Sequence, residues 1–260
     1  MTHRITSIGL ALALCFGTVA SQAAIARFDT TSFGYTVSNG ALNWSTGDQY
    51  QTLNAEARSG GGLLGYDTAT NDWSNWTNQS LGATTPYASA SASAGAQSLQ
   101  GSALASRTDL QPADLAGHAG RSYANQSGVF SLNQDGVVTF SVGWRLEVQG
   151  DASDPLADFG QSLMSIAFGA YDGSFNDYLS EELFSFDALS GAAVASGTWI
   201  FNVALAAGQQ GYYNLTGSAS AEASAQNPND VPEPGSLALL GAGLAALAGA
   251  RRRRKARAHA

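Results

Sequence analysis

The sequence predicts an all-β body, an antiparallel two-sheet sandwich of the jelly-roll type. Two observations carry this prediction. Apolar and small or polar residues alternate with a two-residue period in at least five segments, as they do in strands that bury one face. Only 12% of the residues are charged, while Gly, Ala, Ser and Thr are abundant, which suits short side chains on sheet faces better than long surface helices. We therefore expect packed sheets and no long helix between the two ends of the chain.

The first 23 residues have the pattern of a signal peptide. Arg4 gives a weakly positive start, residues 8–19 form an apolar core, and Ser-Gln-Ala ends at Ala23 as a small-x-small cleavage site. We expect cleavage between Ala23 and Ala24. A cut after Ala26 is the second choice, and an uncleaved anchor helix is the alternative to both.

The first half of the body gives two strand signals. Phe33, Tyr35 and Val37 alternate with small residues, and Asn39-Gly40 follows as a hairpin-type turn. Residues 87–94 alternate strictly between Ala and Ser, apart from Tyr87. This period favours a strand with Ala inward and Ser outward, although a disordered linker and a helix are alternatives.

The second half of the body gives clearer signals. Apolar residues take every even position from Val138 to Val148, after a turn at residues 133–136. Similar alternation predicts strands at residues 164–170, 199–205 and 213–222, with a shorter signal at Phe184 and Phe186. The expected domains are the signal peptide 1–23, the β-sandwich body 24–223, a polar tether 224–230 and a C-terminal region 231–260.

The C-terminal region has three parts in order. A Pro-Glu-Pro element is followed by an apolar segment, expected to be a transmembrane helix over residues 236–250, and by a basic tail over residues 251–257. The uncharged run of residues 235–250 would reach about 24 Å as a helix, short of the roughly 30 Å hydrocarbon core. Because basic residues beside a short span stay cytoplasmic, the body should lie outside.

This order of parts resembles the PEP-CTERM sorting signal of Gram-negative surface proteins. The residues that carry the resemblance are Val231, Pro232, Glu233, Pro234 and Gly235, and then the basic residues Arg251, Arg252, Arg253, Arg254, Lys255 and Arg257. The resemblance implies sorting by an exosortase, with an intermediate anchored in the inner membrane and a final place at the cell surface or outside the cell. The same kind of tail is also called an ice-binding-protein C-terminal domain, which implies nothing about ice for this chain.

Charge is segregated along the chain. All twenty acidic residues lie between Asp29 and Glu233, and residues 24–234 contain only five arginines, so this exported part of the chain has a net charge of −15. Such a surface repels nucleic acid and anionic lipid, and we expect no nucleic-acid partner. Acidity that keeps an exported protein dispersed is the first interpretation, and a cation-binding surface is the second. The only cysteine, Cys15, lies in the signal peptide, so the body has no disulfide.

Candidate catalytic residues are few, and we expect a protein that is not an enzyme and has no cofactor. His118 is the only histidine left in the trimmed body, in a small-residue stretch expected to be a solvated loop without a nucleophile motif nearby. Glu181 and Glu182 are adjacent and would point to opposite faces of a strand. Asp172 and Asp177 share a loop that could hold calcium, although their spacing does not fit an EF-hand.

Three hypotheses for the function follow. The first is a non-enzymatic exported protein of the cell surface or extracellular matrix, associated with exopolysaccharide or biofilm. The second is a carbohydrate- or ligand-binding β-sandwich module, with Trp73 and Trp76 as an exposed stacking pair. The third is a hydrolase that uses Asp and Glu. The sequence leaves open whether the tail is cut.

Overall fold

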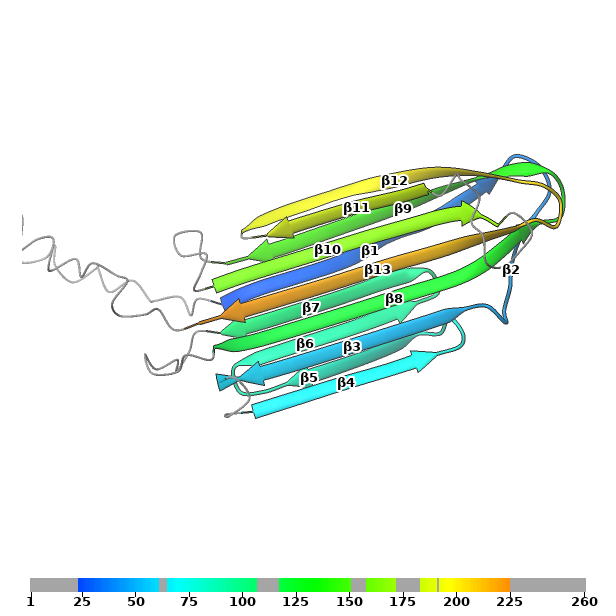
Figure 1. The fold of residues 1–260 in the computed structure, drawn as a ribbon. Coiled ribbons are helices and arrows are strands. Elements are labelled where there is room, and N and C mark those ends of the chain that lie inside the picture. The colour runs from blue at the N-terminus through cyan, green and yellow to red at the C-terminus, as the bar shows by residue number, and fades with distance from the viewer. Residues whose placement is uncertain are drawn as a thin grey trace, which may run out of the picture. The chain divides into compact units, whose positions relative to one another are not determined.

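The body is a sandwich of two antiparallel sheets, seen in a computed structural model that describes residues 23–60, 65–106, 117–150, 158–171, 183–190 and 192–224. Sheet A has the strand order β12-β9-β1-β7-β6-β5, and sheet B has the order β11-β10-β13-β8-β3-β4, with the short β2 paired to β8 (Figure 1). The strands are β1 (Ala23–Val37), β2 (Leu42–Trp44), β3 (Tyr50–Ser59), β4 (Gly65–Trp73), β5 (Gln79–Thr84), β6 (Ala88–Gly95), β7 (Ser98–Ser106), β8 (His118–Leu132), β9 (Gly136–Gln149), β10 (Asp158–Ala170), β11 (Leu183–Ser190), β12 (Ala193–Leu205) and β13 (Gln210–Ala223).

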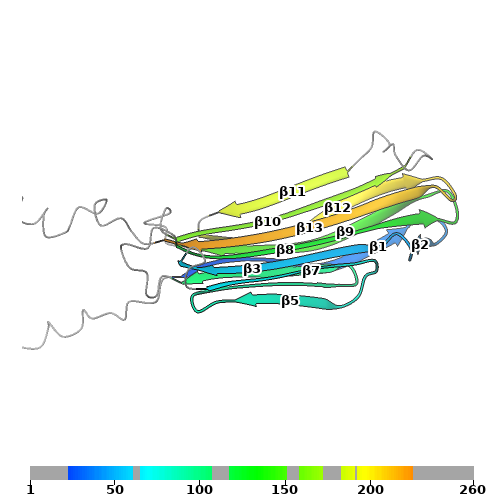
Figure 2. The same ribbon diagram turned by 60° about the horizontal axis from the view of Figure 1, so that its bottom comes forward.

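The predicted architecture of two antiparallel sheets is confirmed. A jelly roll has about eight strands, whereas the described residues of this chain form thirteen, so the likeness to a jelly roll is a coarse one. The long strands of both sheets run along a common axis in both views (Figures 1 and 2). Among the described residues, no helix is long and apolar enough to cross a membrane. The expected transmembrane helix, 236–250, lies outside these residues.

The strands with the clearest alternation are confirmed. In β9 the even residues from Val138 to Val148 are all buried, because they face the space between the sheets. In β6 the four alanines face inward and are at most 6% exposed, while the serines face outward. The Ala/Ser segment is therefore a strand. The expected strands at 164–170, 199–205 and 213–222 lie within β10, β12 and β13.

The turns connect the sheets in a way that the sequence did not predict. Asn39-Gly40 does not close a hairpin, because β1 belongs to sheet A and the next strand, β2, pairs with β8 in sheet B. Gly40 has φ +78°, a conformation that glycine adopts without strain. The turn at residues 133–136 likewise carries the chain from β8 in sheet B to β9 in sheet A. A local turn signal predicts a reversal but not which strand the chain pairs with afterwards.

The core has an aromatic part and an alanine part. In the aromatic part Phe140 stacks on Phe168 with ring centroids 4.0 Å apart, and Phe130 contacts Phe140 edge-on at 5.1 Å. The separate alanine cluster consists of Ala55, Ala57, Ala83, Ala88 and Ala90. Small side chains allow two sheets to approach closely, and the inward-facing Gly120 of β8 continues this narrow part of the sandwich.

The described chain starts and finishes at the same end of the sandwich. The first residue of β1 and the last residue of β13 both lie there, next to the end of β7 and the start of β10 respectively (Figure 1). Ala24 is fully buried and pairs with Ala105. A cut after Ala26 would remove two fully buried alanines from the core, and the cut between Ala23 and Ala24 stays a prediction.

Candidate functional site

The candidate site is a groove of about 430 Å³ on the outer face of sheet B. We call it the Tyr50–Tyr171 groove, after the two tyrosines at its sides. Its polar and aromatic lining includes Asp48, Tyr50, Asn125, Ser127, Tyr171, Tyr212 and Asn214. These residues come from β3, β8 and β13, and from the segments that precede β3 and follow β10.

Strand alternation places these side chains outside. In β8 the even residues from His118 to Leu132 are buried between the sheets, so Asn125 and Ser127 lie on the outer face. The register then aligns Tyr50 with Ser127, Ser127 with Asn214, and Asn214 with Ala167. The floor of the groove is thus one row across four neighbouring strands, with Tyr50 at one side.

Two asparagines fix the polar part of the floor. Asn125 Nδ2 donates to Asn214 Oδ1 at 2.7 Å and to Thr216 Oγ1 at 2.8 Å. Within the described structure, Asn125 Oδ1 and Asn214 Nδ2 make no hydrogen bond to the protein. One acceptor and one donor pair therefore remain available side by side, held by the bond between the two amides.

The aromatic residues differ in exposure. Tyr50 is 55% exposed, whereas Tyr212 is 7% exposed and has its ring centroid 5.7 Å from that of Tyr171. The ring of Tyr212 lies over Gly169, where a Cβ atom would collide with it. Gly169 thus makes room for the tyrosine at the base of the groove, and Tyr50 offers its ring to solvent.

The expectation of an exposed Trp73 and Trp76 pair is wrong. Both side chains are partly buried and pack against the main core. The Trp76 ring contacts Trp44 at 4.8 Å and Tyr213 at 5.5 Å, and its Nε1 donates to the carbonyl of Ser127 at 2.9 Å. The two tryptophans stand in a polar stretch of the sequence, which indicated exposure. Where β4 ends and that its last residue and the segment after it turn toward the core could not be predicted from the sequence.

The expectation that His118 lies in a solvated loop is also wrong. His118 is the first residue of β8 and is 1% exposed. Its Nδ1 accepts a hydrogen bond from the Gly60 N–H at 3.0 Å, and its ring packs on Tyr87 at 4.8 Å. In the sequence, the flanking alanines and glycines suggested a loop, but Ala119 and Gly120 are strand residues of β8.

Asp172 and Asp177, the two residues of the loop that could hold calcium, lie outside the described residues. Within the described ranges, no group of three or more His, Cys, Asp or Glu side chains is placed to hold a metal ion. Calcium binding at the 171–178 loop stays a prediction.

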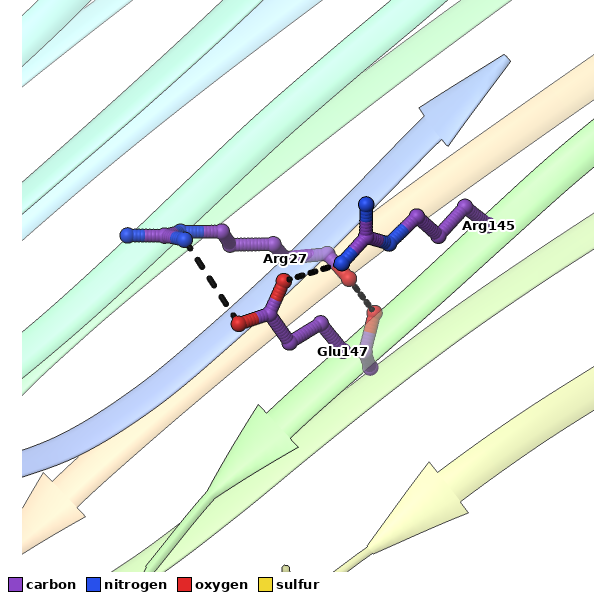
Figure 3. A network of polar contacts seen from close by, with 4 residues as sticks. Arg27, Arg145 and Glu147 are labelled. Carbon is purple, nitrogen blue, oxygen red and sulfur yellow. Dashed lines mark hydrogen bonds and ion pairs between the residues drawn. The ribbon is translucent and has the colours of Figure 1, made fainter. Parts of the chain in front are cut away.

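The described arginines are all paired with carboxylates. On the outer face of sheet A, Glu147 bridges Arg27 at 3.6 Å and Arg145 at 3.2 Å (Figure 3). The backbone of Arg27 also contacts sheet B, because the buried Ser162 of β10 donates from its Oγ to the Arg27 carbonyl at 2.6 Å.

The other two pairs lie on sheet B. Arg58 pairs with Glu56, and Arg121 pairs with Glu222 at 2.8 Å, a hydrogen bond that raises the pKa of Arg121. The part of the surface that the structure describes therefore offers no unpaired arginine to an anion.

Comparison with known proteins identifies the C-terminal region. The family model of the PEP-CTERM protein-sorting motif matches residues 230–254. This match confirms the resemblance carried by residues 231–235 and the basic residues that follow, although these residues lie outside the described structure. The motif is that of exported proteins that an exosortase sorts through a membrane-anchored stage. No curated protein and no solved structure matches the chain.

Proposed function

We propose that the protein is a non-enzymatic component of the cell surface or extracellular matrix whose β-sandwich body associates with exopolysaccharide. The observation that carries the proposal is the presence of a sorting motif at residues 230–254 behind an acidic body with polar outer faces. The motif accounts for export, and the body is the part that remains to act outside the cell.

The outer sheet faces support an association with carbohydrate. On sheet A, Ser89, Ser91 and Ser93 of β6 alternate with buried alanines. On sheet B, Ser218 and Ser220 of β13 do the same. Hydroxyl groups both donate and accept hydrogen bonds, as the hydroxyls of sugars do, so these faces can exchange bonds with a hydrated polysaccharide.

A more specific role, as a carbohydrate- or ligand-binding module, is the second candidate. The Tyr50–Tyr171 groove favours it, because a concave site with a few fixed polar groups and aromatic walls is the usual form of a small-ligand site. The two candidates are compatible, since the groove would provide the contact by which the body associates with the matrix.

Fractionation of cells that make the full chain tests the proposal. We expect the protein in the surface and matrix fraction, with an intact mass that corresponds to a chain ending near Pro234. Enzymatic digestion of the polysaccharide should release the protein from that fraction. Full-length protein in the cytosol with both ends uncut would refute the proposal.

A further inference from the structure

We propose that the Tyr50–Tyr171 groove binds a single chain of a neutral polysaccharide, with Tyr50 stacking on one sugar ring and Asn125 and Asn214 bonding its hydroxyls. The inference rests on the proposed association with exopolysaccharide. It adds the place of binding and the chemical class of the ligand.

The size of the groove fits one sugar chain. Its volume of about 430 Å³ falls within the range of small-ligand sites. The floor runs from Tyr50 on β3 across β8 and β13 to Ala167 on β10. Three strand spacings correspond to about 14 Å, which is wide enough for one pyranose ring with its substituents and too narrow for a bundle of chains.

The polar floor matches vicinal sugar hydroxyls. Asn125 Oδ1 can accept and Asn214 Nδ2 can donate, and the 2.7 Å bond between the two amides holds them in that orientation. Ser127 lies in the same row as Asn214 and adds a hydroxyl. Because these groups are fixed by strand register before the ligand arrives, little ordering is needed on binding.

Tyr50 supplies the apolar contact. Its side chain is 55% exposed, and within the described structure its ring contacts no other aromatic ring. The C–H face of a pyranose is apolar, and a tyrosine ring presents an apolar face with a polar tip. Stacking there would orient the sugar so that its hydroxyls reach the asparagines.

The charges around the groove select a neutral ligand. Among the residues that the structure describes, Asp48 is the one charged residue that lines the groove, and all four described arginines are bound to carboxylates. An acidic polysaccharide would therefore meet a carboxylate without a compensating cation, on an exported chain whose residues 24–234 carry a net charge of −15 before any ligand binds.

Affinity gel electrophoresis tests the proposal with protein purified from the surface of cells that express the full chain. The gels contain neutral polysaccharides (a β-glucan, a mannan and a galactan) or acidic alginate. We expect retardation by at least one neutral polymer and none by alginate. Tyr50→Ala and Asn214→Ala should each weaken the binding at least about tenfold, with an unchanged unfolding midpoint.

Tyr66→Ala is the matched control. Tyr66 is 54% exposed, but it lies opposite Arg58, eight residues along β3 from Tyr50, or about 27 Å away. This variant should bind like the wild type. The proposal is overturned if no neutral polymer retards the protein, if alginate alone does so, or if Tyr50→Ala and Tyr66→Ala behave alike.

Retention of the same variants in the matrix fraction distinguishes a failure of the groove as the binding site from a failure of the proposed function. If the wild type and Tyr50→Ala are retained equally in the matrix fraction, the groove is not the binding site and the proposed function stands. If the wild type is not retained there, the proposed function itself fails.

Discussion

The backbone N–H of Gly60 donates a hydrogen bond to Nδ1 of His118 at 3.0 Å, joining the end of β3 to the first residue of β8. The bond requires a ring whose Nδ1 carries no proton, so the neutral imidazole with hydrogen on Nε2 fits this site. The adjacent Tyr87 ring covers the imidazole. The only histidine of the trimmed body is thus part of the packing at the end of the sandwich where β1 begins.

Replacing His118 with Ala should lower the free energy of unfolding by about 2 kcal/mol, because a buried N–H loses its acceptor and a buried ring is removed. Urea unfolding followed by tryptophan fluorescence measures the change. His118→Asn, whose side-chain oxygen can take the place of Nδ1, should recover part of the loss. Equal stability of His118→Ala and the wild type would show that this bond contributes nothing.

The narrow part of the sandwich should reject a single added methyl group at Gly120. A Cβ atom there would collide with the carbonyls of Ser89 and Leu104 in the opposite sheet, and backbone cannot move aside as a flexible side chain can. We expect Gly120→Ala to destabilise the fold by about 2 kcal/mol or more. Thermal unfolding measures the effect.

Gly82→Ala is the control for this substitution, because the added Cβ would lie 3.7 Å from its nearest neighbour, an ordinary contact. It should change stability by less than about 1 kcal/mol. Similar effects of the two substitutions would mean that the sheets can separate without cost at Gly120.

These glycines also explain why part of the fold could not be predicted from the sequence. The strands with large inward side chains, such as β9 with Phe140 and Trp144, are evident from alternation alone. In β8 the inward positions include Gly120, Ser122 and Gln126, so apolar alternation is absent although the strand is buried. Hydropathy measures apolar content, whereas two sheets can also pack closely because the side chains between them are small.

The candidate site was missed for a related reason. The tail motif is contiguous, and its spacing identifies it without a structure. The groove instead combines Tyr50, Asn125 and Asn214, which are far apart in the sequence and meet only through the strand register. Each is an ordinary outward-facing polar residue of its own strand, so the order of strands in sheet B was needed to bring them together.

Tyr213 should make stability depend on pH in the alkaline range. Complete burial raises its pKa well above the ordinary value of about 10, because desolvation disfavours the phenolate. The unfolded chain then loses this proton at lower pH than the folded chain does. The contribution is therefore constant below about pH 10 and falls by about 1.4 kcal/mol per pH unit above it.

Urea unfolding between pH 9 and 11 measures this slope, and Tyr213→Phe should reduce it by the contribution of one proton. The variant will also be less stable at pH 7, because Gln126 Oε1 loses the hydroxyl that donates to it at 3.2 Å. An unchanged slope would show that the Tyr213 phenol ionises freely in the folded protein.

Trp76 separates a role in packing from a role in binding. Its ring contacts Trp44 and Tyr213, and it supports the groove floor from the inner side through its bond to the Ser127 carbonyl. Trp76→Ala should therefore lower the free energy of unfolding by about 3 kcal/mol. Trp76→Phe should lower the free energy of unfolding less, since it keeps ring contacts but not the N–H donor.

Tyr50→Ala should leave the free energy of unfolding within about 0.5 kcal/mol of the wild type, because the Tyr50 ring faces solvent. If Trp76→Ala kept full stability but abolished polysaccharide binding, Trp76 would contact the ligand directly. That result would contradict the assignment of its ring to packing inside the sandwich.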